Sequence, residues 1–190
     1  MKRLVLASCS PRRKEILGMF RRDLITVSSH ADETADENMT PAQIVTALAK
    51  RKAEAALRGY EKDIVIGSDT IVYADGKILG KPKDRAEARD MLNTLSGCTH
   101  SVFSGVAVIC DGKEYTGYEE TKVTMREITD SEKDAYLRSG EGDDKAGAYG
   151  IQGMACAFIE KIDGSYHNVL GLPVFTLCKL LGNAGEELIK

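Results

Sequence analysis

The sequence predicts a mixed α/β fold, in which helices pack around a twisted sheet. At the front of the chain, short apolar runs alternate with segments of helical periodicity, as in strand–helix pairs. In the middle, strand-like stretches meet at Asp75-Gly76 and Asp111-Gly112, and such dipeptides favour tight hairpin turns. Hydrophobic residues make up 43% of the chain and charged residues 29%, which is typical of a globular protein. We therefore expect residues 1–190 to form a single domain.

The first elements are indicated by apolar runs and by helix-start residues. Residues 4–7 and 24–27 are predicted strands, and the first of them is expected to be buried. Between them, Pro11 suits the first position of a helix, and Ser10 suits its N-cap.

A second helix is expected to start after Thr40 with a capping box and to end near residue 58. Its inward-facing residues are predicted to be Ile44, Val45, Leu48 and Ala55. The remaining elements are predicted from the same signals: a strand at 64–66 that resumes at 71–73, a helix at 84–95, strands at 101–110 and 114–126, a helix at 130–138, a glycine-rich loop at 140–153, a strand at 155–162 and a last helix from 173 to 181.

Charge, cysteine content and hydropathy argue against several classes of protein. The net charge is −3, whereas a nucleic-acid-binding protein usually carries a basic excess. The five cysteines are odd in number and widely spaced, so we expect reduced, mostly buried thiols rather than disulfides or a zinc site. No apolar run approaches the ~20 residues of a membrane span. These features predict a cytoplasmic protein without nucleic-acid or membrane partners, and they leave open whether it forms a homodimer.

The first candidate site is the turn at residues 8–13, with the sequence SCSPRR. A strand end, small residues and a helix start direct free N–H groups and the helix dipole toward the turn, which favours anion binding. The hydroxyls of Ser8 and Ser10 can donate to phosphate oxygens, and Arg12 and Arg13 add fixed charge and forked donors. On spacing alone, a capped helix with two solvated arginines explains the turn at least as well.

The second candidate is Asp69, which lies between the apolar segments 65–66 and 71–72. A carboxylate buried there without a partner would be costly, and carboxylates in such places often bind metals or act as general bases. The alternative is an aspartate that accepts from nearby backbone N–H groups. Glu33, in the acidic loop at 30–39, would complete a magnesium site with Asp69, although a solvated loop is the simpler interpretation of that segment.

Two lysines and a glutamine extend this hypothesis. Lys52 lies late in the second predicted helix, and Lys81 follows a hairpin; each alone would be assigned to the surface. Together with two arginines and a metal, they would balance the roughly four negative charges of a triphosphate. Gln152 offers both a donor and an acceptor, which suits a pyrimidine base edge, although its loop is also explained by plain flexibility.

Several short motifs, taken in order, resemble those of the Maf family of nucleotide pyrophosphatases. They are LAS at 6–8, SPRR at 10–13, SDT at 68–70, GKP at 80–82, LSG at 95–97, KAGAYGIQG at 145–153 and GLP at 171–173. None of them is specific alone, but their combination and order are, and they span nearly the whole chain.

The resemblance implies an inosine-triphosphatase-like fold with two lobes around a cleft. It also implies a house-cleaning enzyme that cleaves a nucleoside triphosphate between its α- and β-phosphates. By the family's pattern, Asp69 is the catalytic proton acceptor. We expect Mg²⁺ or Mn²⁺ as the cofactor, bound by Glu33 and Asp69. The expected substrate-binding residues are Ser8, Ser10, Arg12, Arg13, Lys52, Thr70, Lys81 and Gln152.

Three positions resemble the branch of the family that acts on dTTP and UTP. In the branch that prefers 7-methyl-GTP, tryptophan replaces the first arginine of SPRR and glutamine replaces the threonine of SDT, whereas this chain has Arg12, Thr70 and Gln152. The expected products are the monophosphate and pyrophosphate, and modified pyrimidine nucleotides are further candidate substrates. Two alternatives stay open: a purine or 7-methyl-GTP preference on the same fold, and a nucleotide-binding regulator of septum formation and cell division.

Overall fold

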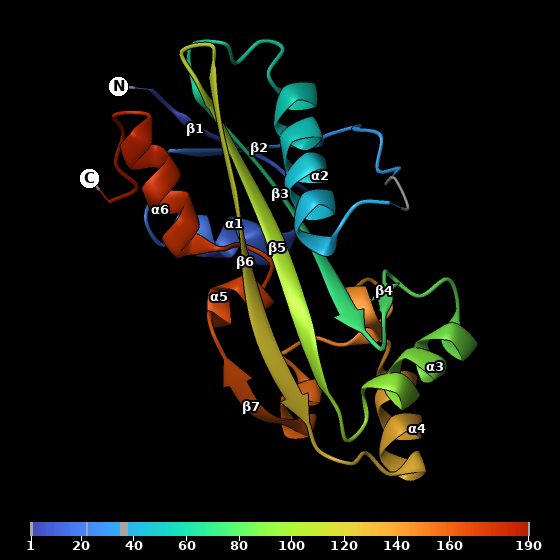
Figure 1. The fold of residues 1–190 in the computed structure, drawn as a ribbon. Helices are drawn as coiled ribbons and strands as arrows, with labels where there is room; N and C mark the ends of the chain where they lie inside the picture. The colour runs from blue at the N-terminus through green and yellow to red at the C-terminus, as the bar shows by residue number, and fades with distance from the viewer. Residues whose placement is uncertain (1, 22, 35–37, 190) are drawn as a thin grey trace. The chain divides into compact units, whose positions relative to one another are not determined.

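The computed structural model describes residues 2–21, 23–34 and 38–189, and it has the predicted mixed α/β architecture (Figure 1). Seven strands form one sheet in the order β2-β1-β3-β5-β6-β7, with β4 paired to β3. The strands are β1 (Leu4–Ala7), β2 (Leu24–Val27), β3 (Ile64–Ala74), β4 (Lys77–Leu79), β5 (Thr99–Cys110), β6 (Lys113–Met125) and β7 (Ile159–Asp163). The helices are α1 (Pro11–Gly18), α2 (Pro41–Ala56), α3 (Arg85–Leu95), α4 (Asp130–Ser139), α5 (Tyr166–Val169) and α6 (Val174–Asn183).

The chain divides into two compact units. The first contains residues 1–69, 104–119 and 171–190, and the second contains residues 70–103 and 120–170. Strands β3, β5 and β6 contribute residues to both units.

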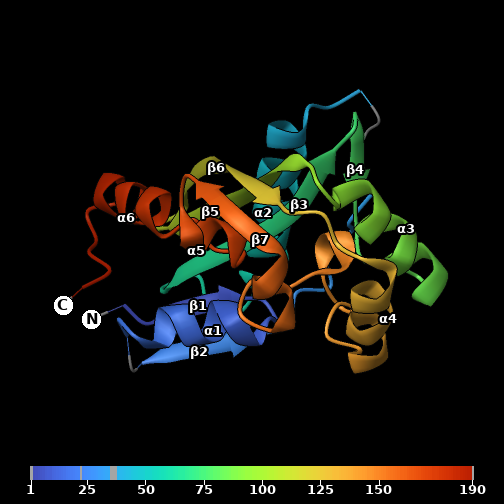
Figure 2. The ribbon, with the colours of Figure 1, turned by 90° about the horizontal axis from the view of Figure 1, so that it is seen from below.

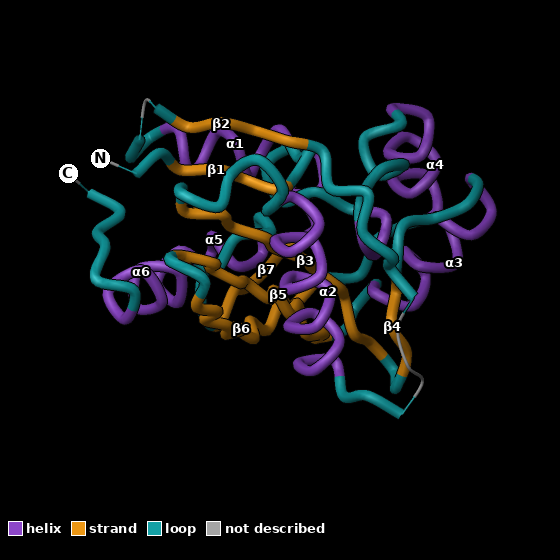
Figure 3. The backbone as a smooth tube through the Cα atoms, turned by 90° about the horizontal axis from the view of Figure 1, so that it is seen from above, coloured by secondary structure: helices purple, strands orange, loops and turns teal. Residues whose placement is uncertain are grey.

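In the first unit, the parallel strands β1 and β2 end at the same edge of the sheet, and β3 continues past it. β1 pairs with β2 and with β3, and Ala7 lies opposite Val27 and Gly67. α1 lies beside β1 and β2 in both views of this region (Figures 2 and 3). Because the carboxyl ends of parallel strands meet at one edge, the residues that follow Ala7 and Gly67 are brought close together.

Helix α2 packs closely against the sheet where two glycines allow it. A Cβ atom on Gly67 would overlap backbone atoms of Ala49 and Ala53, and one on Gly105 would overlap the Val45 carbonyl. This close approach fixes the height of Lys52 above β3, since Lys52 is the neighbour of Ala53 in the helix. The prediction that Ala55 faces inward was wrong: that residue is exposed, and Ala53 and Ala56 are buried instead.

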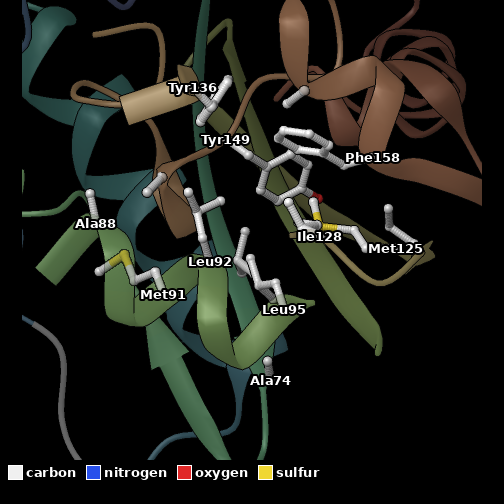
Figure 4. Packing of buried hydrophobic residues seen from close by; sticks show 14 of the residues in the cluster. Ala74, Ala88, Met91, Leu92, Leu95, Met125, Ile128, Tyr136, Tyr149 and Phe158 are labelled. Carbon is white, nitrogen blue, oxygen red and sulfur yellow. The ribbon is translucent and has the colours of Figure 1, made fainter. Parts of the chain in front are cut away.

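The second unit has its own apolar core, which Figure 4 shows from close by. Side chains of α3, such as Leu92 and Leu95, are fully buried in it. Tyr136 of α4 meets Phe158 edge-on, with ring centroids 5.5 Å apart. α3 and α4 lie side by side in this unit (Figures 1 and 2).

Two local predictions differ from the structure, and one short helix was missed. β3 is continuous from Ile64 to Ala74, without the expected interruption. Residues Met154–Phe158 form a 3₁₀ helix instead of a strand, because the Glu141 carboxylate accepts hydrogen bonds from the Met154 and Ala155 backbone N–H groups. The four-residue helix α5 was not predicted, and part of the predicted acidic loop, residues 35–37, lies outside the described residues.

The thiols and the helices bear on two further expectations. All five cysteines are free, but the expectation of mostly buried thiols was wrong, because among them Cys110 alone is buried. In the part of the chain that the structure describes, no helix is both long enough and apolar enough to cross a bilayer.

Candidate active site

The predicted site residues fall into two groups. Seven of them belong to the first unit: Ser8, Ser10, Arg12, Arg13, Glu33, Lys52 and Asp69. The second unit contains Thr70, Lys81 and Gln152.

Glu33, Lys52 and Asp69 form a carboxylate–lysine cluster in the first unit. The Lys52 ammonium nitrogen lies 2.5 Å from the Asp69 carboxylate and 2.8 Å from that of Glu33. The side chains of Lys52 and Asp69 are largely buried, with 12% and 13% exposure, whereas Glu33 is exposed. Asp69 therefore has the Lys52 ammonium as an ionic partner, which neither interpretation included and which offsets the cost of its desolvation. Its role as a metal ligand or general base stays a prediction.

Arg51 holds the segment that carries Glu33. Its guanidinium donates to the Thr34 carbonyl at 2.5 Å and to the Asp32 carbonyl at 3.4 Å, on either side of Glu33. The Asp32 carboxylate in turn accepts from the backbone N–H and the hydroxyl of Thr34, closing a tight local turn. Arg51 was not among the predicted site residues. Its position beside Lys52 was the sequence feature that could have indicated its contact with the segment of Glu33.

The serine–arginine turn, residues 8–13, has the capped geometry that the sequence indicated. Ser10 is the N-cap of α1, and its hydroxyl accepts from the Arg13 backbone N–H. The Ser8 hydroxyl accepts from the Ser10 backbone N–H at 3.1 Å and from Arg13 Nη1 at 3.4 Å. In both serines these bonds use the oxygen as an acceptor, so the hydroxyl hydrogen stays available for a further acceptor, such as a phosphate oxygen.

Arg13 is half-buried, and its guanidinium bonds to other residues of the first unit. Its Nε donates to the Gly171 carbonyl at 2.6 Å. Burial lowers the pKa of Arg13 and the nearby charge of Arg12 lowers it further, while the negative charges of Asp69 and Glu33 raise it. An arginine stays protonated in proteins despite such shifts, so Arg13 keeps a fixed positive charge that interacts with the carboxylates of the cluster.

Ser68 and Gly171 complete this arrangement, and their roles were not predicted. The fully buried Ser68 hydroxyl lies 2.8 Å from the Gly105 carbonyl and 3.0 Å from the Gly171 carbonyl. The same Gly171 carbonyl accepts from Arg13, so Ser68 and Arg13 share one acceptor. Gly171 has φ +101°, a conformation that favours glycine, and the two motifs SDT and GLP contained the only sequence signal for this contact.

In the second unit, Lys81 and Gln152 are exposed and Thr70 is half-buried. Lys81 lines a shallow pocket of about 360 Å³ with residues of β4 and α3. The segment before Lys81 is tied to the glycine-rich loop, because Gly147 N–H donates to the Gly80 carbonyl at 3.0 Å. Their participation in the same site as Asp69 stays a prediction.

The glycine-rich loop is anchored by a buried pair that was also not predicted. His100 Nε2 and the Tyr149 hydroxyl lie 2.7 Å apart, and both side chains are buried. Burial lowers the pKa of His100 to about 4 and raises that of Tyr149, so both side chains are neutral near pH 7. Gln152 therefore lies three residues after a fixed point of the loop.

The carboxylate–lysine cluster fits a divalent cation that brings other ligands with it. Glu33 and Asp69 supply hard oxygen donors, and an oxygen of each lies within hydrogen-bond distance of the Lys52 ammonium. Within the described ranges, no group of three or more His, Cys, Asp or Glu side chains is placed to hold a metal ion by itself. Mg²⁺ often binds one or two carboxylates together with water and substrate phosphates, and the donor set suits a site of that kind.

Basic and hydroxyl donors lie beside paired carboxylates, at the edge of the sheet where the parallel strand β1 ends. This arrangement defines a class of α/β protein suited to binding phosphorylated ligands. Sequence comparison makes this class specific. The profile of the family described as "Maf-like protein" matches residues 3–184, and this chain belongs to that family.

The chain is similar to named relatives over nearly its whole length. It is 49% identical to a protein of Bacillus cytotoxicus named "dTTP/UTP pyrophosphatase", over 95% of each chain. It is 47% identical to a protein of the same name from Bacillus pumilus, over 97% of this chain and 98% of the relative. Among solved structures, the Staphylococcus aureus Ham1 protein matches with a TM-score of 0.45 and 18% identity, over 65% of this chain and 72% of that one.

Proposed function

We propose that this protein hydrolyses dTTP and UTP to the monophosphate and pyrophosphate. The observation that carries the proposal is that Arg13 shares the Gly171 carbonyl with Ser68, whose neighbour Asp69 belongs to the carboxylate–lysine cluster. A carboxylate suited to proton removal and a guanidinium suited to phosphate oxygens are the two functions that this hydrolysis needs. The names of the relatives from B. cytotoxicus and B. pumilus support the choice of nucleotide.

In the proposed mechanism, Asp69 accepts the proton of the water that attacks the α-phosphorus. Ser8 and Ser10 donate hydroxyl hydrogens to phosphate oxygens, and Arg12, Arg13, Lys52 and Lys81 bind the charge of the triphosphate and of the leaving pyrophosphate. Glu33 and Asp69 would hold Mg²⁺ or Mn²⁺, which when bound would supply positive charge against the phosphates and Lewis acidity toward water. One carboxylate oxygen cannot serve as both metal ligand and base, so we assign these tasks to different oxygen atoms of Asp69.

We further propose that Arg12, Thr70 and Gln152 carry the preference for pyrimidines. Uracil and thymine present a donor at N3 between two carbonyl acceptors, and a glutamine amide offers the complementary acceptor and donor. The nucleotide pool on which such an enzyme would act is cytoplasmic, so we propose the cytoplasm as its location.

The test is a panel of triphosphates, in which pyrophosphate release is measured with Mg²⁺, with Mn²⁺ and without metal. The panel contains dTTP, UTP, CTP, ATP, GTP and 7-methyl-GTP. We expect the highest kcat/KM for dTTP and UTP, and release only when a metal is present. Faster release from a purine nucleotide would replace the proposed substrate, and binding of dTTP without release would favour a nucleotide-binding regulator over an enzyme.

A further inference from the structure

The Lys52 ammonium occupies the point on which the oxygens of Glu33 and Asp69 converge. We propose that Lys52 is an internal counter-ion, which keeps free divalent metal out of the site until a triphosphate draws the lysine away. The inference rests on the proposed function, because it assigns the metal to these two carboxylates. It makes metal binding depend on the nucleotide through one side chain of this protein.

Charge balance is the first argument for this role. Two carboxylates carry two negative charges, and Lys52 already offsets one of them at hydrogen-bond distance from both. A divalent ion that arrives alone must either displace the ammonium or bind beside a like charge, and Coulomb repulsion is strong at such short separations when water is partly excluded. Among the described residues, no third carboxylate, histidine or cysteine is placed to help the ion compete.

A triphosphate changes this balance because it offers Lys52 another partner. The ammonium sits on a flexible four-carbon stem with rotatable donors, so it can move several ångströms while its backbone stays in place. That backbone is held by the close packing of α2 on Gly67. Arg13 and Ser68 bond to the same Gly171 carbonyl, and Ser68 is the neighbour of Asp69, to which Lys52 is paired, so phosphates bound by Arg13 would lie near Lys52.

The same helix supplies a matched comparison. Lys50 also meets two carboxylates, with its nitrogen 2.6 Å from Glu114 and 3.6 Å from Glu54. Its side chain is 43% exposed, against 12% for Lys52, so water screens its charge. A lysine that only stabilises a surface ion pair should behave like Lys50, whereas an internal counter-ion should change the affinity of the site for metal.

The experiment measures Mn²⁺ binding to the full chain without nucleotide, by electron paramagnetic resonance of the free ion and by calorimetry. Four proteins are compared: the wild type, Lys52→Gln, Lys52→Arg and Lys50→Gln. Removal of a unit charge so close to the ion should tighten Mn²⁺ binding by about tenfold or more in Lys52→Gln. Lys52→Arg keeps the cation and Lys50→Gln keeps Lys52, so both should bind Mn²⁺ as weakly as the wild type.

The proposal is overturned if Lys52→Gln binds Mn²⁺ no more tightly than Lys50→Gln. Circular dichroism checks that the variants are folded, and Lys52→Met, which keeps the aliphatic stem, replaces the glutamine variant if that one is not. Pyrophosphate release is measured separately on the wild type. Tighter Mn²⁺ binding in Lys52→Gln, together with no pyrophosphate release from any triphosphate, would refute the proposed function and leave the counter-ion role standing. Unchanged Mn²⁺ binding in Lys52→Gln, together with pyrophosphate release by the wild type, would refute the counter-ion role and leave the proposed function standing.

Discussion

Arg13 donates from Nε to the carbonyl oxygen of Gly171 at 2.6 Å, a contact between residues 158 positions apart. Ser68 reaches the same oxygen at 3.0 Å. Because protein acceptors already hold part of the Arg13 guanidinium, its remaining N–H groups have a fixed orientation. The side chain therefore loses less conformational entropy when it binds a ligand. Gly171 and Ser68 therefore determine where the charge of Arg13 is placed.

Replacing Arg13 by lysine should lower kcat/KM for dTTP by about 10- to 100-fold. Lysine keeps the charge but cannot donate both to Gly171 and to Ser8 in the geometry of a guanidinium, and hydrogen bonds to charged groups contribute about 1.5–3 kcal/mol. Steady-state pyrophosphate release measures the effect. The exposed Arg58, changed to lysine, is the control, and equal activity of the two variants would contradict the positioning role.

Replacing Ser68 by alanine should lower the free energy of unfolding by about 1–3 kcal/mol. The change removes the Ser68 donor from the Gly105 carbonyl, and a buried acceptor that loses its donor carries a penalty of this size, while the Gly171 carbonyl keeps its bond from Arg13. Urea titration measures the loss, with Ser28→Ala at an exposed position as the control. The variant should also lose activity, since the carbonyl that holds Arg13 is less fixed; a stable, fully active variant would be inconsistent with the shared acceptor.

Arg51→Gln should lower kcat/KM about three- to tenfold with little change in unfolding midpoint. Its bonds to the carbonyls of Asp32 and Thr34 are exposed, so they contribute little to stability, but they fix the segment of Glu33. Activity and thermal melts of this variant are compared with those of Arg58→Gln. A loss of activity shared by both variants would point to general charge effects instead.

Local chemistry is what made much of the fold predictable. The capping boxes of Thr40 with Gln43 and of Thr129 with Glu132 are both present, because each needs only four consecutive residues. The turn at Asp75 and Gly76 has positive φ at both positions, as the dipeptide favours. The apolar run at residues 4–7 likewise became β1, fully buried.

What could not be predicted depends on partners far away in the sequence. Alternation of apolar residues after position 154 indicated a strand. The Glu141 carboxylate, 13 positions before Met154, instead accepts from the first backbone N–H of the 3₁₀ helix Met154–Phe158. The ionic partner of Asp69 lies 17 positions away, on a helix whose distance from the sheet is set by Gly67. The site residues could be named from the sequence because its motifs resemble those of the Maf family. The contacts among Ser68, Gly171 and Arg13 could not, because they depend on how distant parts of the chain pack together.

Asp69→Asn should reduce turnover by about 100-fold or more while the fold is retained. Asparagine keeps the shape and one carbonyl oxygen, but it is a far weaker base and metal ligand, and general base catalysis typically contributes 10²–10⁴-fold. Lys52 keeps Glu33 as a partner, so α2 should stay in place. Pyrophosphate release is measured beside circular dichroism, with Asp134→Asn at the surface as the control. Normal turnover in the Asp69 variant would exclude it as the base.

The last prediction concerns the pH dependence of stability through His100. Burial lowers the pKa of this side chain from 6.5 to about 4. Between these values the unfolded chain binds a proton that the folded protein does not, so stability falls as the pH drops from 6.5 to 4. The free energy of unfolding is therefore higher above pH 6.5 than at pH values below 4, by about 3 kcal/mol from His100, at 1.36 kcal/mol per unit of pKa shift.

His100→Phe should remove this part of the pH profile. The variant loses the bond to Tyr149 and is less stable at neutral pH, but its free energy of unfolding should decrease less steeply between pH 6.5 and 4 than that of the wild type. Urea titrations across this range measure both profiles, and carboxylates contribute equally to each. His30→Asn, at an exposed position, leaves His100 intact and should keep the wild-type slope. Parallel profiles for wild type and His100→Phe would mean that the buried imidazole is not the group that titrates.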